Sequence, residues 1–520
     1  MICYEGTIIT CNENNAIAGY LVEDGGKILY AGDTLPAQYQ TCRRISLGDQ
    51  ALLPAFVDTH QHFASFATFH AGLNVMDAES NQEIADMIAS FLKTCKNKTL
   101  IAFGASPCSV REGHLISRDE LDKVCPDKPA MVVKYEGHAC VINSLLLKKL
   151  QKKLAGLRGY HPDTGEMNQE AFFAVSNYIT NSLSIVELVQ NMQRAMDYMA
   201  SVGIGTVHSV SGVGFPLNLD ISLEKWMAAS AQSGFQLRIF PQSMDIRTAL
   251  RRKLPRIGGC FSNALDGCFG SRDAALLKPY EGSSSKGVLY YSDAQVADFC
   301  KAANRAGLQI ELHAIGDAAF EQAARSIKAA LDDYPRTDHR HGIIHACLPT
   351  AEGLEVCREY QIQLPVQTAF IDWKQEPDSY LESILGSRSS MLNPLQTMWN
   401  KGLILSAGSD APCTAPNPIA WIHKACNHSN PSQALTLDQA LRMCTYNGAW
   451  ATFDEKLRGS LEAGKLADMV LLSANPYEVP RERLQEIQVR RLYLQGRPYQ
   501  QQSRSAAGAL LTGIFSRNAK

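Results

Sequence analysis

The sequence lacks the features that identify membrane, secreted and nucleic-acid-binding proteins. No apolar stretch approaches the roughly 18 residues of a membrane span, and no basic N-terminal region precedes an apolar run. The 50 lysine and arginine residues are balanced by 52 aspartate and glutamate residues, so no basic field attracts nucleic acid or anionic lipid. We therefore expect a cytoplasmic protein that has neither a membrane nor a nucleic acid as its partner.

Two further absences concern cysteine spacing and nucleotide motifs. The 15 cysteines are an odd number, and no two of them are spaced as C-x-x-C. This pattern favours reduced thiols over a disulfide framework or a cysteine-rich zinc site. The chain also has no G-x-x-x-x-G-K-[ST] motif and no predicted strand followed by G-x-G-x-x-G, so nucleotide-dependent chemistry has no support.

The composition is that of a large globular protein. At 520 residues the chain exceeds the size at which a single core stops growing, so at least two structural units are expected. Hydrophobic residues make up 45% and charged residues 20%, which excludes intrinsic disorder and fibrous repeats. The sequence thus predicts a multi-unit enzyme that acts on a small-molecule substrate.

Short alternating strands are predicted at both ends of the chain. Residues 1–52 alternate apolar and polar positions, with a hairpin signal at Asp24-Gly25-Gly26. Residues 456–500 repeat this texture and include a buried run from Met469 to Leu472. We expect the two segments to form one small composite β-sandwich domain; the alternative is two unrelated edge hairpins.

The middle of the chain alternates strand-like and helix-like patterns. Ser292 and Thr350 are predicted N-caps of two of the helices, and Gly307 is a predicted C-terminal stop. Eight such units predict an α/β fold, a parallel (β/α)₈ TIM barrel over residues 53–455. The predicted strands are residues 53–60, 203–210, 236–243, 258–266, 308–315, 341–347, 362–370 and 403–410. Residues 63–180 are predicted to be an insertion after the first strand, and residues 501–520 a C-terminal tail.

The segment LLPAFVDTHQHF carries the most informative chemical pattern. Side chains alternate along a strand, so Asp58, His60 and His62 are predicted to share one face. At the C-terminal mouth of a barrel, where active sites of this fold lie, the two imidazoles can ligate one divalent ion.

Three further residues are predicted at the same end of other strands. His313, His345 and Asp410 each follow a short apolar run and precede small or turn residues. Taken singly, each fits a hydrogen-bonded core histidine or an aspartate helix cap better than a metal ligand. Together they favour a metal site, because burying all of these groups unpaired would cost several kcal/mol.

These segments resemble a known family. PAFVDTHQH, ELHAIGD, IIHA, AGSDAP and GSLEAGKLADMVLL are similar to signatures of the metal-dependent amidohydrolase superfamily, and of its amidohydrolase 3 (YtcJ-like) branch. The likeness extends to about residue 475 and includes KYEGHACVINSLLL, HPDTGEMNQEA and DGCFGSRDAALLKPY. It implies a barrel with a mono- or dinuclear metal centre and a small β-sandwich built from both chain ends.

The resemblance also implies roles for individual residues. His60, His62, His313 and Asp410 match metal ligands, and Zn²⁺ is the expected ion. His345 matches either a ligand of a second metal or a residue that orients the water and polarises the substrate. Asp410 would in addition be the general base.

One departure from the family pattern bears on the number of metal ions. Members with two metals usually carry a bridging carboxylated lysine or a glutamate at the end of the fourth strand, but neither residue type occurs between Lys253 and Lys278. Cys260 and Glu170 are candidate replacements that the spacing does not argue for. The sequence therefore favours one tightly held ion, with two ions as the alternative.

Substrate-binding candidates lie outside this ligand set. His138, with Asn143 nearby, belongs to a motif of the branch, and Asp266 and Arg272 follow the fourth strand, where a structural ion pair is the alternative. Residues for which lining, solvated or packing roles are predicted are His208, His339, His341, Trp373, Cys413 and Trp421.

The predicted chemistry is hydrolysis of a C–N bond in an amide, urea, formamide, cyclic amide or amidine-like group. A metal-activated water attacks, and Asp410 takes its proton. The alternative is a catalytically degenerate, metal-binding barrel with a regulatory or interaction role. Proteins similar to this one are commonly dimers, so a homodimer is compatible with the resemblance.

Overall fold

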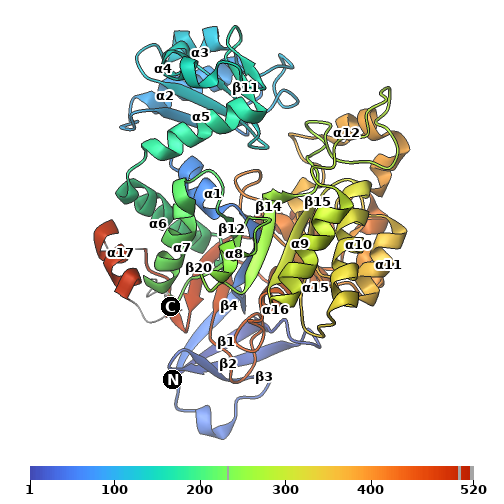
Figure 1. Cartoon of the computed structure of the whole chain (residues 1–520). Helices are drawn as coiled ribbons and strands as arrows, with labels where there is room; N and C mark the ends of the chain where they lie inside the picture. The colour runs from blue at the N-terminus through green and yellow to red at the C-terminus, as the bar shows by residue number, and fades with distance from the viewer. Residues whose placement is uncertain (231–233, 502–504, 516–520) are drawn as a thin grey trace.

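The computed structural model describes residues 1–230, 234–501 and 505–515. Eight short parallel strands lie at its centre, and they follow one another along the sequence with helices between them (Figure 1). Each of them overlaps one of the eight predicted strands. These strands are β5 (Phe56–Gln61), β12 (Ile204–Ser211), β13 (Gln236–Pro241), β14 (Arg256–Ala264), β15 (Gln309–Ala314), β16 (Gly342–His345), β17 (Leu364–Val366) and β18 (Leu405–Ala407).

The eight strands pair in three sets, with orders β13-β12-β5, β14-β15-β16 and β17-β18. A parallel bridge between Gly342 and Gln363 joins β16 to the residue before β17, and another between Gln61 and Ala411 joins β5 to the loop after β18. Strands β13 and β14 are in contact, although no ladder joins them within the described residues. Neighbouring strands thus follow the order expected for a barrel, and β13 and β14 are the one adjacent pair without strand pairing among the described residues.

Helices between the strands begin and end where the sequence predicts. Ser292 caps α9 (Asp293–Arg305) in a capping box, and Gly307, just beyond this helix, has a φ of 77° that favours glycine. Thr350 accepts the backbone N–H of Gly353 at the start of α11 (Ala351–Glu359). The other helices that flank these strands include α6 (Ile185–Ser201), α7 (Leu219–Ser230), α10 (Asp317–Asp333), α14 (Pro418–Cys426) and α15 (Leu437–Cys444).

Both chain ends contribute to one seven-stranded sheet, with the order β21-β20-β19-β4-β1-β2-β3. Its centre is β4, which pairs in parallel with β1 and antiparallel with β19. The predicted hairpin is present between β2 and β3, where Gly25 and Gly26 have positive φ angles. The strands are β1 (Ile2–Ile9), β2 (Ile17–Asp24), β3 (Lys27–Gly32), β4 (Arg43–Pro54), β19 (Met469–Leu472), β20 (Val489–Leu494) and β21 (Arg497–Pro498).

Between β5 and β12 the chain forms a separate lobe with a six-stranded sheet, ordered β10-β11-β9-β8-β7-β6 (top of Figure 1). Its two faces bury different hydrophobic clusters, one under α2 and α3 and the other under α4 and α5. The elements are β6 (Leu73–Asn74), α2 (Asn81–Leu92), β7 (Leu100–Ala105), α3 (Arg118–Val124), β8 (Ala130–Lys134), β9 (Ala139–Ile142), α4 (Ser144–Leu154), β10 (Tyr160–His161), β11 (Glu166–Asn168) and α5 (Gln169–Ser182).

The predicted tail is helical over part of its length. Helix α17 (Ala506–Phe515) packs against α7, while residues 502–504 and 516–520 lie outside the described residues. No single helix in the described ranges has the length and hydropathy of a membrane span. Helices α5 and α6 together reach that length and composition, but they are bent by 100° at the break between them.

Candidate active site

Six side chains with metal-binding atoms meet at the C-terminal ends of the parallel strands. His60 lies near the end of β5, Cys260 lies within β14, and Asp410 follows β18. Two of the positions have strained backbones, since His345 and Asp410 have φ angles of 72° and 54°, in a region that non-glycine residues seldom adopt. The six residues are His60, His62, Cys260, His313, His345 and Asp410.

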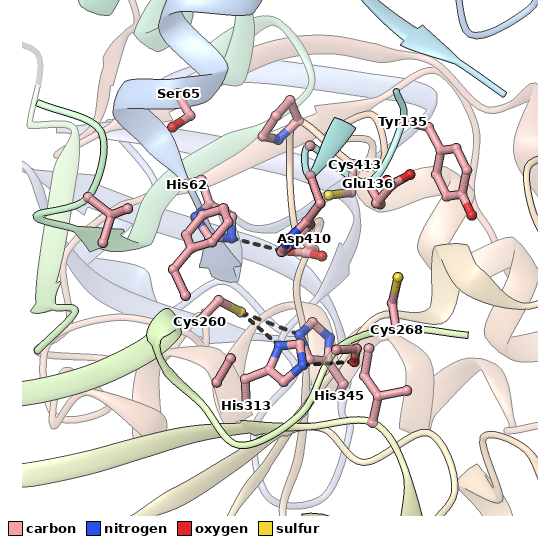
Figure 2. Close-up of a pocket in the computed structure, with 18 of the residues that line it drawn as sticks. His62, Ser65, Tyr135, Glu136, Cys260, Cys268, His313, His345, Asp410 and Cys413 are labelled. Carbon is pink, nitrogen blue, oxygen red and sulfur yellow. Dashed lines mark hydrogen bonds and ion pairs between the residues drawn. The ribbon is translucent and has the colours of Figure 1, made fainter. Parts of the chain in front are cut away.

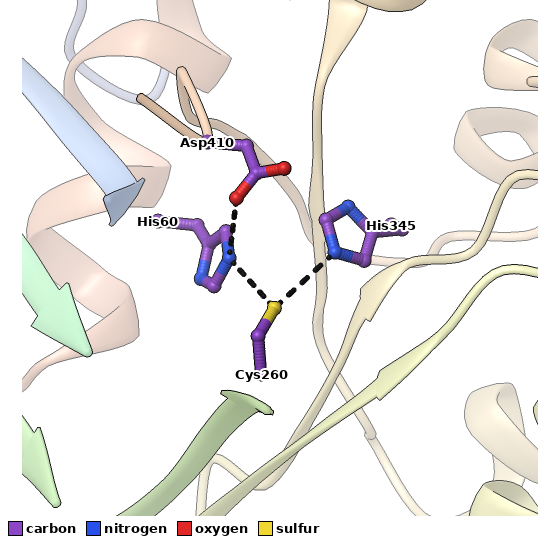
Figure 3. Close-up of side chains that lie close together, drawn as sticks. All are labelled: His60, Cys260, His345 and Asp410. Carbon is purple, nitrogen blue, oxygen red and sulfur yellow. Dashed lines mark hydrogen bonds and ion pairs between the residues drawn. The ribbon is translucent and has the colours of Figure 1, made fainter. Parts of the chain in front are cut away.

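Four of these residues form a compact group (Figure 3). One donor atom from each of His60, Cys260, His345 and Asp410 lies within 4.8 Å of all the others, and all four residues are buried. The Nε2 atom of His60 is 3.1 Å from Oδ1 of Asp410 and 3.2 Å from Sγ of Cys260. Nε2 of His345 is 3.5 Å from the same sulfur atom. Donors of this kind at this spacing can share one cation.

The other two histidines flank the group on opposite sides (Figure 2). Nε2 of His62 is 3.3 Å from Oδ1 of Asp410, and Nδ1 of His313 is 3.2 Å from Sγ of Cys260. The structure therefore brings together every ligand that the sequence predicted. It also places Cys260, which the spacing did not argue for, between the two halves of the set.

The hydrogen bonds around the imidazoles determine which ring nitrogen is unprotonated. Nδ1 of His345 donates to Oε1 of Gln367 at 2.6 Å, which leaves the lone pair of Nε2 directed toward Cys260. Nε2 of His313 faces the carbonyl of Gly267 at 3.3 Å, which leaves Nδ1 directed toward the same sulfur atom. Both rings thus present a metal-binding nitrogen to the centre.

The residues fit a divalent cation. Oδ1 of Asp410 is buried and accepts no hydrogen bond among the described residues, although it lies close to two imidazole nitrogens. An anionic oxygen in this position is costly unless a cation neutralises it. The imidazole, thiol and carboxylate donors are those that Zn²⁺ takes in proteins.

The protonation states also suit a metal site. Burial raises the pKa of Asp410, but the close contacts with the imidazoles of His60 and His62 and the charges of His60 and His345 together outweigh it and hold this pKa well below its usual range. Burial lowers the pKa of His345 well below its usual range. Asp410 is therefore ionised and His345 is neutral at neutral pH, as metal ligands must be. Burial raises the pKa of the Cys260 thiol, and a bound cation would act in the opposite direction.

A second layer of residues holds the ligands in position. Asp58 accepts the backbone N–H of Ser409 at 2.9 Å and its hydroxyl at 2.6 Å, and so fixes the residue before Asp410. Asp266 lies 3.5 Å from Nε2 of His313. Burial lowers the pKa of this histidine, but the hydrogen bond and charge of Asp266, the charge of Asp410 and the carbonyl of Gly267 together outweigh burial and raise it. Carboxylates behind ligating histidines orient the ring and increase its basicity.

The predicted substrate-binding residues have different surroundings. His138 lines a cavity of about 140 Å³ above the metal-binding group, 5.4 Å from the ring of Phe261. Burial lowers the pKa of His138 to about 4, so it is neutral. Asn143 instead caps α4, where its side chain accepts the N–H of Leu146.

Asp266 and Arg272 have different surroundings. Although Asp266 lines the cavity, its carboxylate accepts backbone N–H groups from three residues, which is a structural arrangement. Arg272 is exposed and does not belong to the cavity lining. The three donors to Asp266 are Ala275, Ile315 and Gly316.

Several weaker candidates have structural surroundings. Nε2 of His208 is 3.1 Å from the hydroxyl of Thr452, and Trp421 is fully buried. Glu170 is paired with Arg158 on the surface, far from a bridging position. His339 and His341, predicted to be solvated, are buried and hydrogen-bonded, because the chain before β16 lies under neighbouring elements.

Four cavity residues were missed or given other roles by sequence reasoning. Trp373 and Cys413, predicted to pack in the core, line the cavity, together with Glu136 and Glu376. Glu136 lies in the motif KYEGHACVINS, two residues before His138, so this motif is the sequence feature from which Glu136 could have been predicted to line the site. Glu376 lies in a loop after β17 that has no pattern of its own.

Comparison with known proteins agrees with this geometry. The model of the amidohydrolase family matches residues 43–500. The chain is 23% identical over 484 residues to Bacillus subtilis (strain 168) YtcJ, which is named as an amidohydrolase, covering 87% of this chain and 89% of that protein. It is 23% identical over 556 residues to the N-substituted formamide deformylase of Arthrobacter pascens, covering 95% and 97%.

Among solved structures, an uncharacterized metal-dependent hydrolase from Pyrococcus horikoshii OT3 superposes with a TM-score of 0.74. The two are 22% identical, and the match covers 92% of this chain and 99% of the other, so the likeness shows a shared fold. The resemblance seen in the sequence motifs is thereby confirmed. Because the family model spans most of its length, this chain belongs to the amidohydrolase family.

Proposed function

We propose that this protein is a metal-dependent hydrolase of a C–N bond in a small molecule. The convergence of six metal-binding side chains at one end of the parallel strands carries the proposal. The relative named as a formamide deformylase supports bond cleavage of this type. Retention of every predicted ligand counts against a catalytically degenerate barrel, whose ligands would be free to change.

The proposal includes the architecture that positions the site. Residues 53–455 form a (β/α)₈ barrel with residues 63–180 as its insertion, and residues 1–52 and 456–500 form a composite β-sandwich. The order of the parallel strands and the sheet shared by both chain ends support these boundaries. All 15 cysteines are free in the structure, which supports a cytoplasmic location. The proposal also includes a homodimer, which rests on the resemblance to the amidohydrolase family.

The ligands are His60, His62, His313 and Asp410, with His345 beside the reacting carbon or bound to a second ion. A divalent ion such as Zn²⁺ supplies Lewis acidity and lowers the pKa of a bound water to about 7. The single-ion count stays a prediction. It is based on the lack of a bridging lysine or glutamate on the fourth strand. Because Sγ of Cys260 on that strand lies 3.2 Å from nitrogens of both His60 and His313, a two-ion centre to which Cys260 would contribute is the alternative.

The chain's own residues account for the proton transfers. Asp410, held in the ionised form, accepts a proton from the attacking water and returns it to the leaving amine. His138 is neutral and lines the same cavity, so it can donate a hydrogen bond to the oxygen that becomes negative. The one N–H of neutral His345 is donated to Gln367, so this residue instead directs the lone pair of Nε2 into the site. The substrate types that fit are amides, formamides, cyclic amides and amidine-like groups.

Metal content measured beside activity tests the proposal. We expect the wild type, purified without added metal, to contain tightly bound metal and to hydrolyse members of an amide, formamide and deaminase-substrate panel. Asp410→Asn should lower turnover by about 10²- to 10⁴-fold, the usual contribution of a general base, while Asp49→Asn, at an exposed position of β4, should not. A metal-free protein with full activity would refute the mechanism.

His345→Asn separates the two metal counts. With one ion, we expect the metal content to stay unchanged while turnover falls; with two, the content falls as well. Two full equivalents in the wild type would refute the single-ion prediction.

A further inference from the structure

Two series of aromatic rings extend from the candidate metal-binding residues along the cavity. The first begins at His345, whose ring stacks on Phe370 with centroids 5.9 Å apart. Phe370 stacks on Trp373 at 4.9 Å, and Trp373 meets Tyr135 edge-on at 5.0 Å. This series forms a continuous wall from the metal site to Tyr135.

The second series begins at His62, whose ring is 4.8 Å from that of Phe261. Phe261 is 6.2 Å from Phe173, and Phe173 is 5.4 Å from Phe172. All of these rings line the same cavity. The space next to the metal site therefore suits an aromatic or other apolar group, which gains from burial and from ring contacts.

The first wall ends at two buried carboxylates. The hydroxyl of Tyr135 donates to Oε1 of Glu376 at 2.8 Å, and Glu136 directly follows Tyr135 in the chain. Glu136 and Glu376 are 8% and 9% exposed, and both line the cavity. An acidic end to an otherwise apolar cavity requires an explanation, because buried charges are normally paired.

The charge of Lys134 acts on both carboxylates, but one positive charge cannot balance two negative ones. Lys134 pairs with Glu136, with Nζ 3.3 Å from Oε2, but no salt bridge of the described residues reaches Glu376. Oε2 of Glu136 is buried and accepts no hydrogen bond within the same part of the chain. Burial raises the pKa of Glu376, and burial raises that of Glu136 to about 7, so a further cation beside them would stabilise their ionised forms.

We propose that the substrate carries a protonated amine, which pairs with Glu376 and Glu136, on the far side of an aromatic or apolar body from the C–N bond that is cleaved. This inference rests on the proposed function and narrows it to a substrate class. The aromatic face of Trp373 favours the same cation through its negative π-system, while Nζ of Lys134 already lies 5.5 Å from the ring centroid of Tyr135. The rings hold the body of the substrate, and the two carboxylates select the charge of its far end.

Three phenylacetamides that differ only at the para position test the inference. They carry an aminomethyl, a methyl or a carboxyl group, so that the far end is cationic, neutral or anionic. Hydrolysis of each amide consumes one water and yields the arylacetic acid and ammonia. Both kcat/KM, from ammonia release, and Kd, from calorimetry, are measured on the metal-loaded full-length protein. The wild type should favour the cation over the neutral compound by about 10- to 100-fold, the scale of a buried charge-assisted hydrogen bond.

Two variants assign that preference to the carboxylates. Glu376→Gln keeps an acceptor for Tyr135 but removes the charge, and should bring the cationic and neutral compounds close to equal affinity. Glu136→Gln serves the same purpose if the first variant does not fold. Glu359→Gln, exposed on α11, is the matched control and should keep the wild-type preference.

The outcomes separate this inference from the proposed function. A wild type that binds the cationic and neutral compounds equally, or prefers the anion, overturns the inference even when all three are hydrolysed. A preference that survives in both glutamine variants also overturns it. Failure of the metal-loaded protein to hydrolyse any C–N substrate counts against the proposed function, while the Kd values still decide the charge preference.

Discussion

At the scale of single residues, Cys260 is central to the candidate metal site, because its sulfur lies within 3.5 Å of three imidazole nitrogens. We expect Cys260→Ala to lower both metal content and turnover, since it removes the donor between the two halves of the ligand set. Cys300→Ala, which removes a buried thiol in α9, is the control and should retain the metal. Elemental analysis of both variants decides, and unchanged metal content in Cys260→Ala would assign the thiol a packing role.

His208 makes a prediction about pH. Burial lowers its pKa from 6.5 to about 3, so the unfolded chain binds one more proton than the native state between these values. Stability is therefore lost as the pH falls below 6.5, by about 1.4 kcal/mol per pH unit from this group. His208→Gln removes this dependence, so the stability of this variant relative to the wild type should rise as the pH is lowered.

The thermal midpoints of both proteins are measured in a series of buffers from about pH 7.5 down to about pH 5.5. Over this range the unfolded chain takes up a proton at His208 and the native state does not. His161→Gln replaces an exposed histidine and should follow the wild type. Parallel curves for wild type and His208→Gln would show that this histidine does not titrate between the two states.

The sequence was informative about residues whose chemistry is tied to strand ends. His60, His62, His313, His345 and Asp410 could be predicted because each follows an apolar run, and parallel strands end together. Cys260 could not be placed in this way, since a cysteine inside a strand is usually a packing residue. Glu376 comes from a loop, and its position depends on contacts that only the folded chain makes.

At the scale of elements, β14 depends on two glycines that precede Cys260. Gly258 and Gly259 have φ angles of 126° and 124°, and a Cβ on Gly258 would overlap the carbonyl oxygen of Glu311 in β15. We expect Gly258→Ala to push β14 away from β15, lower the thermal midpoint and release metal, because Cys260 and His313 lie on these two strands.

The matched control is Gly282→Ala. Gly282 also has a positive φ, of 67°, but nothing lies within 4 Å of an added Cβ, so this change carries backbone strain without the overlap. Equal losses of stability in the two variants would show that the approach of β15 is not what requires Gly258.

Strands β17 and β18 are shorter than the apolar pattern of the sequence predicts. Each was predicted over more than seven residues, but only three residues of each are extended, from Leu364 to Val366 and from Leu405 to Ala407. Burial continues past the strands, because residues 367–368 and 408–410 in the loops that follow are also buried. Burial, which the sequence pattern reports, therefore extends further than strand pairing.

At the scale of the whole molecule, we expect the chain ends to be indispensable. A chain that stops at residue 455 loses β19, so the edge of β4 from Ala51 to Pro54 has no partner and its apolar residues are exposed. It should be insoluble or free of metal, while a chain that stops at residue 500 keeps the sheet and should stay soluble. Gel filtration and metal analysis compare the two. A soluble, metal-bound chain of residues 1–455 would show that the sheet is dispensable.

The pairing of β4 with β19 also has a consequence for protein synthesis. The two strands are separated by about 400 residues of sequence, and ribosomes add roughly 5–20 residues per second. The edge of β4 that β19 will cover thus emerges roughly 20–80 s before its partner has been translated. During that interval the strand that leads directly into β5 and its histidines is unprotected, so the nascent chain depends on chaperones more than its final stability suggests.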